Sequence, residues 1–249
     1  MRKFGAIVYQ EFYQALRHPT QGIILVLFYG LFAYLGIALG YTELVTSING
    51  VPTIRWMIPG LVLFSVMLLS YQHGLWRLVE KDSNGYLAHL RSATTGEGLL
   101  ISAYLLAAVL RALLKSVLVV LLFWILWGGL GSVENWLIFF GVAAIAGIFW
   151  AGLGMSLALL VKKVSLNSHI LIEFLIPLLI FSGLLYPVAY YPRAVATIAS
   201  VLPSTQAFSL ARAPFGIGEW NLWLGLGLCM WSIVGIVLAI ISLKRERRI

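Results

Sequence analysis

Long apolar runs separated by short polar segments dominate the chain. A helix needs about 20 mostly apolar residues to cross the hydrocarbon core of a bilayer, and six runs reach that length. They cover residues 22–41, 56–76, a stretch within 99–127, 136–161, a run that begins near 170 and loses its pattern at Pro187, and 220–243. Barrel strands would alternate, and isolated strands in lipid would leave backbone groups unpaired. The pattern therefore predicts an all-α membrane protein with six transmembrane helices.

The first 19 residues have a different pattern, that of an amphipathic helix. The apolar residues Phe4, Ile7, Val8, Phe12, Ala15 and Leu16 fall on one side of a helix, and the polar residues Lys3, Gln10, Gln14 and Arg17 fall on another. Pro19 would end the helix. Such a helix can lie in the headgroup plane, so we expect residues 1–19 to form an interfacial helix. A segment that orders only on contact with the membrane is the alternative.

Two longer segments between the runs are neither spans nor simple loops. In the polar connection 77–98, Leu87 and Leu90 keep helical spacing after a turn signal at residues 84–85. The segment 186–218 stays largely apolar but contains four prolines, Pro187, Pro192, Pro203 and Pro214. We expect a short helix in the first segment, docked against something outside the membrane. In the second we expect short external helices that dip back into the outer leaflet.

Composition indicates one membrane domain over residues 1–249. Of these residues 61% are hydrophobic and 10% are charged, and the mean hydropathy is +0.96. A soluble domain would need about 25% charged residues. The net charge of +8 is expected to reflect orientation and contact with anionic lipid rather than with nucleic acid. The single cysteine, Cys229, excludes an internal disulfide and a multi-cysteine metal site.

The distribution of basic residues predicts the orientation. Fourteen of the 17 Lys and Arg residues fall on one side of the predicted membrane, and only Arg55, Arg193 and Arg212 fall on the other. Because basic residues gather on the cytoplasmic side, we expect both termini in the cytoplasm of a multi-pass protein of the plasma (inner) membrane. Two termini on one side require an even number of spans, which favours six.

The sequence contains no motif for catalysis. It lacks the GxxxxGK[ST] loop of ATPases, and it also lacks HExxH and GxSxG. Of the four dispersed histidines, only His169 has an acidic residue at helical spacing, Glu173. That pair is a weak candidate for metal binding or proton relay, and an interfacial ion pair is the simpler interpretation. We therefore predict no catalytic residue and no metal site.

Two basic residues near the bilayer are a sharper signal. Arg111 and Lys115 share a face of the third span, and too few residues would remain before Gly128 if the hydrocarbon core began after Lys115. At least one of them must lie at or inside the inner boundary, where a basic group costs up to about 2.5–3.5 kcal/mol. Either both side chains extend to the headgroups, or they pair with Glu173. In the second case these residues and His169 are candidates for the inner mouth of a pathway.

Several short motifs occur in an order that resembles a known family. Ile58-Pro59-Gly60 opens the second span, and Glu80-Lys81 precedes Gly85 in the polar connection. Around the fifth run the sequence contains Pro177, Ser182-Gly183, Tyr186-Pro187, Tyr191-Pro192, Leu202-Pro203 and Ala211-Arg212. With the spans, this order is similar to that of the type-2 ABC export permeases over nearly the whole chain. The Glu-Lys motif departs from the family, because its spacing to the glycine is one residue longer.

The resemblance implies a permease that moves a hydrophobic or amphipathic substrate out of the cytoplasm or the inner leaflet: a drug, a natural product, a lipid or a lipid-linked glycan. Two copies or paralogues would pair in the lipid, and separate ATPase subunits would bind ATP and Mg²⁺, since this chain binds no cofactor. A coupling helix within 77–98 would contact the ATPase through Glu80, Lys81, Asp82, Gly85 and Arg91. The external broken segment would include Gly183, Pro187, Pro192, Pro203 and Arg212.

Two other classes of function stay open from the sequence alone. An intramembrane lipid-modifying enzyme would need a cluster of acids, histidines or a nucleophile at one depth, and only His169 and Glu173 approach this. A non-transporting membrane assembly subunit would carry the same kind of docking loop. Copurification of an ATPase separates the permease from both alternatives.

Overall fold

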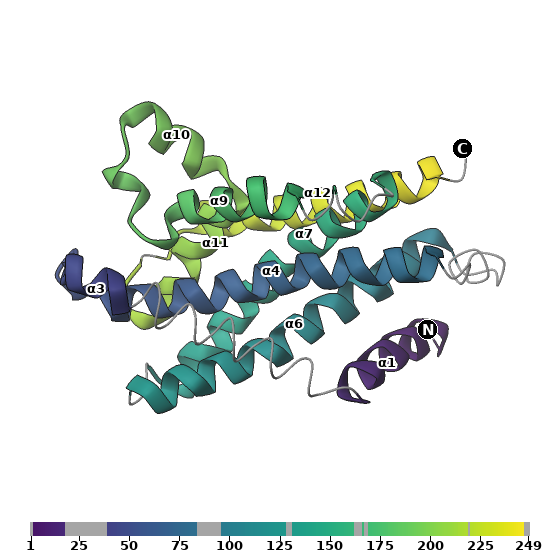
Figure 1. Ribbon diagram of the computed structural model, residues 1–249, viewed down its shortest axis with the longest axis horizontal. Helices are drawn as coiled ribbons and strands as arrows, with labels where there is room; N and C mark the ends of the chain where they lie inside the picture. Colours follow the sequence, from purple (N-terminus) through teal and green to yellow (C-terminus); the bar gives the residue numbers. More distant parts are fainter. Residues whose placement is uncertain are drawn as a thin grey trace.

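Long apolar helices form the frame of the molecule. The computed structural model describes residues 2–17, 39–83, 96–127, 131–161, 166, 169–218 and 220–246. The helices α4 (Thr53–Ser83), α6 (Glu97–Trp127), α7 (Val133–Leu160) and α12 (Leu222–Glu246) run along the long axis of the molecule (Figure 1). Within the described residues, these four are long and apolar enough to cross a membrane. They match the second, third, fourth and sixth predicted spans, so an all-α membrane protein is confirmed.

Six spans are not confirmed. Most of the first predicted span, residues 22–41, lies outside the described residues. The fifth is a helical stretch of η2 (Ile170–Leu175), α9 (Ile176–Leu179) and η3 (Ile180–Leu184), in which η2 and η3 are π-helical. Its apolar helix is too short to be a span by itself. The stretch is broken at Gly183, whose φ of 93° a glycine adopts without steric cost.

Two short helices follow the fifth stretch. After η4 (Val188–Tyr190), α10 (Arg193–Val201) and α11 (Pro203–Arg212) meet at 85°, and η5 (Ala213–Phe215) continues α11. Pro192 directly precedes α10 and Pro203 begins α11, positions that suit the fixed φ of proline. The predicted short helices with proline breaks are therefore present within 186–218. Their depth in the bilayer stays a prediction.

A small hairpin lies at the same end of the molecule. It follows α3 (Gly40–Leu44) and pairs β1 (Ser47–Ile48) with β2 (Val51–Pro52) in antiparallel register. Asn49 and Gly50 both have positive φ, 52° and 78°, as the two-residue turn of a tight hairpin requires. The hydroxyl of Tyr190 donates a 2.6 Å hydrogen bond to Oδ1 of Asn49, which connects the hairpin to η4. We call this region, with α10 and α11, the α10 end.

Helix α4 lies at the centre of the bundle, and 89% of its most apolar 18 residues are buried. It packs mainly against α7 and α6, and α12 packs on another side of α7. Glycines allow the closest approaches on α7: a Cβ at Gly154 would meet the carbonyl of Tyr71 on α4, and one at Gly152 would meet Gly235 on α12. Backbones can approach this closely only where the side chain is a hydrogen atom.

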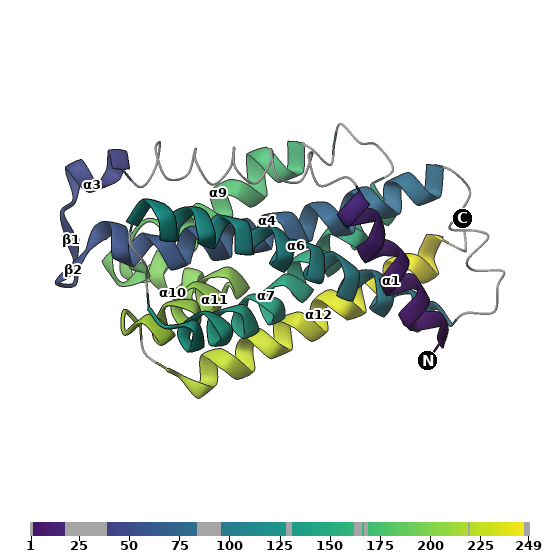
Figure 2. The ribbon, with the colours of Figure 1, turned by 90° about the horizontal axis from the view of Figure 1, so that it is seen from below.

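The opposite end of the molecule carries the N-terminal helix. Helix α1 (Arg2–Arg17) packs against α6, and it lies at the same end of the long axis as the C-terminal end of α12 (Figures 1 and 2). The helix predicted within residues 1–19 is thus present, while its position in the headgroup plane stays a prediction. We call this region, with the last turns of α4 and α12 and the first turns of α6, the α1 end.

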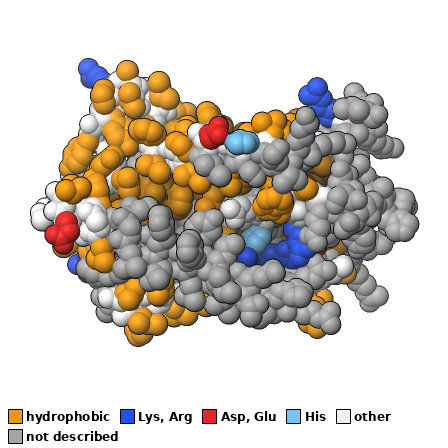
Figure 3. Space-filling view, viewed as in Figure 1, with side chains coloured by type: hydrophobic (Ala, Val, Ile, Leu, Met, Phe, Trp, Pro, Cys, Tyr) orange, Lys and Arg blue, Asp and Glu red, His pale blue; other side chains and the backbone are white. Residues whose placement is uncertain are grey.

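On the face drawn in Figure 3, hydrophobic side chains make up most of the coloured surface, with few charged groups between them. Large apolar side chains point outward along α6 and α12, for example Trp124, Ile125, Met230 and Ile241. A water-soluble protein seldom exposes such continuous apolar area, so this surface is suited to lipid or to other apolar helices.

Candidate functional site

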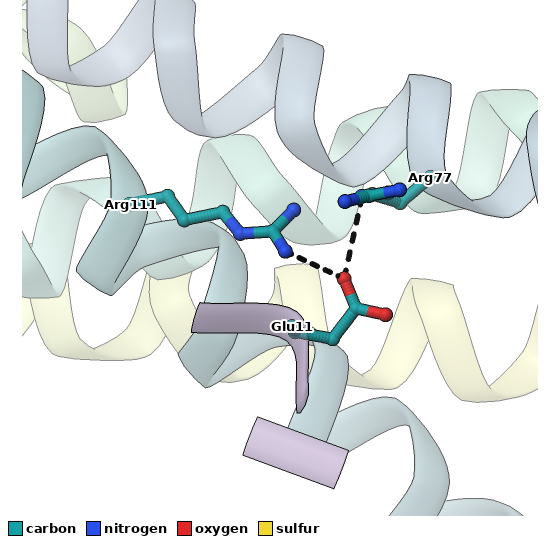
Figure 4. Close-up of polar contacts among 3 residues, drawn as sticks. All are labelled: Glu11, Arg77 and Arg111. Atoms are coloured by element: carbon teal, nitrogen blue, oxygen red, sulfur yellow. Dashed lines mark hydrogen bonds and ion pairs between the residues drawn. The ribbon is translucent and has the colours of Figure 1, made fainter. Parts of the chain in front are cut away.

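A buried ion cluster connects three helices at the α1 end. Nη2 of Arg111 on α6 donates a 2.9 Å hydrogen bond to Oε2 of Glu11 on α1, and Nε of Arg77 on α4 lies 3.3 Å from the same oxygen. The carboxylate thus lies between two guanidinium groups (Figure 4). Glu11 is 1% exposed and Arg111 is 3% exposed. Burying a carboxylate is costly unless it is paired and hydrogen-bonded, and both conditions are met here.

Further basic groups lie one helical turn from this cluster. Lys115 follows Arg111 on α6 and is partly buried, and His73 precedes Arg77 on α4. Residues four apart share a face of a helix. Nε2 of His73 is buried and has no hydrogen-bond partner in the described part of the chain. The facing sides of α4 and α6 therefore carry two layers of basic side chains at the α1 end.

The four sequence-predicted pathway charges are not brought together. Arg111 neither extends to the headgroups alone nor pairs with Glu173, because Glu11 of α1 is its partner. Glu173 instead pairs with Nδ1 of His169 at 2.9 Å, and both side chains are exposed. No third His, Cys, Asp or Glu within the described residues completes a metal site around that pair. The geometry favours an exposed ion pair at this position.

Glu11 is a member of this buried cluster that the sequence analysis did not identify. It is the first acidic residue of the chain, and none follows before Glu43. A helix places it next to Ile7, Val8 and Phe12, within the face that we identified as apolar. A single acid inside an apolar face was the available signal, since such a group is stable only when a buried cation pairs with it.

The proposed coupling residues lie partly inside α4. The helix continues to Ser83, so Glu80, Lys81 and Asp82 belong to its last turns, and the polar connection begins later than residue 77. Buried Leu78 and the bond between Arg77 and Glu11 explain why the helix extends this far. Gly85 and Arg91 lie outside the described residues.

At the α10 end, Arg212 connects α11, η3 and α4. Its Nε donates to the carbonyl of Trp56 at 3.2 Å, Nη1 to that of Gly183 at 2.9 Å, and Nη2 to that of Leu184 at 3.0 Å. The guanidinium carbon lies 3.4 Å from the centre of the Trp56 ring, a cation–π contact. The planar fork of an arginine thus satisfies the carbonyls that the broken helix at Gly183 leaves without helical partners.

A cavity of about 450 Å³ opens beside Arg212. Its wall comes from the β1–β2 turn, α4, η3, η4, α11 and the start of α12, whereas α10 contributes no residue. Of the predicted residues of the external segment, it brings together Gly183, Pro187 and Arg212. Pro192 and Pro203 are not part of the wall and serve as starts of α10 and α11. We call this the Arg212 cavity.

Residues 2–215, from α1 to the end of η5, match the family model of the ABC-2 type transporter. The chain belongs to the ABC-2 type transporter family. It is therefore a transmembrane permease component of a transporter and not itself the ATPase. No curated protein was found to be similar to this ABC-2 type chain.

Proposed function

We propose that this ABC-2 type permease exports a hydrophobic or amphipathic substrate with energy from a separate ATPase. The observation that carries the proposal is the family match, which covers the Glu11 cluster, Arg212 and three of the four long apolar helices. The chain has no phosphate-binding loop of its own, so the energy must come from a partner. In this proposal the partner ATPase binds ATP and Mg²⁺.

The ATPase would bind at the α1 end, on the connection between α4 and α6. This connection is polar in sequence, and α4 and α6 are the two helices that Glu11 joins through Arg77 and Arg111. A displacement of the connection would therefore move the ends of both helices and α1 as one unit, because breaking the cluster would leave a buried charge unpaired. Helix α4, the most buried of the long helices, would carry that displacement towards the Arg212 cavity.

The proposed complex contains two permeases and two ATPase subunits, with the α1 end in the cytoplasm. The excess of Lys and Arg in the segments at that end supports this orientation. The exposed apolar surfaces of α6 and α12 would be covered partly by lipid and partly by the second permease, a copy or a paralogue.

The first test is purification of the tagged chain from its native cells in mild detergent, followed by mass spectrometry. We expect an ATPase with a phosphate-binding loop in stoichiometric amounts. Repeated absence of such a subunit, with the permease folded and intact, would contradict the proposed ATP-driven mechanism. A transport assay in vesicles then tests substrates from each proposed class.

A further inference from the structure

The Arg212 cavity contains a buried cation that no described acid neutralises. Arg212 is 5% exposed, and its hydrogen bonds to three carbonyl oxygens use three of its five N–H groups. No ion pair joins it to a carboxylate within the described residues, and no described Asp or Glu lines the cavity. Carbonyl oxygens offset a guanidinium charge only in part, so an anion in the cavity would be stabilised.

Three other polar side chains of the wall, those of Asn49, Thr205 and Asn221, are available as donors. Oδ1 of Asn49 accepts from Tyr190, and Oδ1 of Asn221 accepts from the backbone N–H of Trp223 at 2.9 Å. Each amide therefore retains its NH₂ group for a ligand. The hydroxyl of Thr205, a residue only 7% exposed, has no hydrogen-bond partner in the described part of the chain. An unsatisfied buried hydroxyl costs free energy that a ligand oxygen would recover.

The wall also has an apolar part, beside the hydroxyl-bearing residues Ser182 and Ser209. The side chains of Trp56, Phe208 and Leu224 line the cavity together with Pro187, Val188 and Ile217. Donors and a cation beside an apolar surface suit a molecule that has an anionic oxygen group and an apolar part. The volume of about 450 Å³ falls within the range of small-molecule sites.

We propose that the Arg212 cavity binds the oxyanion, a carboxylate or a phosphate, of an anionic amphiphile. Arg212 neutralises its charge, Thr205 and the amides of Asn49 and Asn221 donate to its oxygens, and the apolar wall holds the adjoining carbon chain. The site follows from the geometry, while its use for the transported molecule rests on the proposed function. The same chemistry fits the head group of a membrane lipid or a transported solute.

The test measures the electrostatic potential in the cavity with a single thiol. The full chain carries Cys229→Ser and Thr205→Cys and is held in nanodiscs of zwitterionic lipid. Two methanethiosulfonates react with this thiol, one with an anionic sulfonate group and one with a cationic trimethylammonium group. The measured ratio is the rate with the sulfonate reagent divided by the rate with the trimethylammonium reagent. The same ratio at Ser200→Cys, on the exposed surface of α10 outside the cavity wall, is the reference. We expect the ratio at position 205 to favour the sulfonate by roughly tenfold over the reference, because a buried cation attracts anions.

Protection experiments identify the source of the anion. Inorganic phosphate should slow the reaction at position 205 if a solute occupies the site. Nanodiscs that contain phosphatidylglycerol should slow the reaction without added phosphate if a lipid head group occupies the site.

A ratio at or below the reference, or no protection by either anion, overturns the proposal. If position 205 is unreactive, Asn221→Cys at the exposed edge of the wall is measured, and no reaction at either position also overturns it. The assay uses no ATPase, so its outcome is independent of the test of the proposed function.

Discussion

At the scale of single residues, the carboxylate of Glu11 determines how α1 is attached. Two guanidinium groups from different helices converge on one of its oxygens, so each of the three charges depends on the other two. Replacing a buried pair by apolar groups can be neutral, whereas removing one member leaves an uncompensated charge. Single substitutions in the Glu11 cluster should therefore have larger effects than substitutions of exposed charges.

The first prediction concerns Glu11→Gln. The amide keeps the size of the side chain but removes its negative charge. The guanidinium groups of Arg77 and Arg111 then lose the carboxylate that they share. We expect a loss of about 3–5 kcal/mol, and a fall of the thermal unfolding midpoint on the order of 10 °C in detergent. Glu43→Gln, at an exposed carboxylate of α3, is the matched control and should leave the midpoint unchanged. Equal midpoints for both variants would show that the cluster contributes nothing to stability.

A sequence could not reveal the partner of Glu11, because Arg111 lies 100 residues away along the chain. The sequence drew attention to Arg111 and Lys115 near the predicted membrane boundary, but the choice of partner depends on how α1 packs on α6. The same limit applies to Arg212. The order of motifs placed it after the broken segment, whereas its three carbonyl partners come from α4 and η3 and are set only by the tertiary structure.

At the scale of helices, the approach of α7 to its neighbours depends on the absence of side chains. Gly154 faces the backbone of α4 and Gly152 faces that of α12, so α7 is in backbone contact on two sides. Gly141 belongs to the same helix but has open space where a Cβ would be. The two positions thus separate the effect of packing from the effect of glycine on helix formation.

The second prediction compares Gly154→Ala with Gly141→Ala. At position 154 the methyl group would collide with the Tyr71 carbonyl, and because backbone cannot rotate away, α4 and α7 must separate. We expect a loss of about 1–3 kcal/mol of stability for Gly154→Ala. Gly141→Ala should be neutral or stabilising by up to about 1 kcal/mol, since alanine favours a helix. Unfolding followed by circular dichroism gives both values, and a neutral Gly154→Ala would mean that the helices do not approach as described.

Helices of uniform apolar sequence were predictable, and broken elements were not. The runs at 56–76 and 220–243 were recognisable from their length alone, because any helix that crosses the hydrocarbon core needs about 20 apolar residues. At the fifth run, prolines and Gly183 indicated a break, but not the π-helical turns or the 85° angle between α10 and α11. The hairpin was missed even though residues 49–50 are Asn-Gly, a strong turn signal, because its strands have only two residues each.

At the scale of the whole molecule, the two ends differ in charge and in structure. The α1 end has the Glu11 cluster and the basic last turn of α12, whereas the α10 end has short helices, a hairpin and a cavity. Basic residues of membrane proteins are retained on the cytoplasmic side. The charge difference between the two ends therefore predicts that the α1 end faces the cytoplasm.

The third prediction tests this orientation. Tyr191→Cys, at the α10 end, and Lys163→Cys, in the segment that follows α7, are introduced singly in a Cys229→Ser background. We expect an impermeant thiol reagent to label position 191 only from outside the cell and position 163 only from inside. Lys244→Cys, in the last turn of α12, should behave like position 163. Labelling of positions 191 and 163 from the same side would contradict the orientation.

The fourth prediction concerns the contact with the ATPase. Glu80 and Lys81 lie in the last turns of α4, next to the connection that we propose as the docking site. Their joint replacement by alanine removes two charges from that site and keeps residues that favour a helix, so the spans should stay folded. We expect roughly tenfold weaker binding of the ATPase, which corresponds to about 1.4 kcal/mol, with an unchanged unfolding midpoint of the permease alone.

The matched control replaces Lys244 and Arg245, exposed charges in the last turn of α12 at the same end of the molecule. Because α12 does not flank the connection between α4 and α6, this pair should leave the ATPase bound. The amount of ATPase recovered per permease gives the result for both variants. Normal recovery with full transport-coupled ATPase activity for the Glu80 and Lys81 variant would exclude these side chains from the contact. Equal losses in both variants would instead indicate a general electrostatic attraction of the α1 end rather than a defined site on α4.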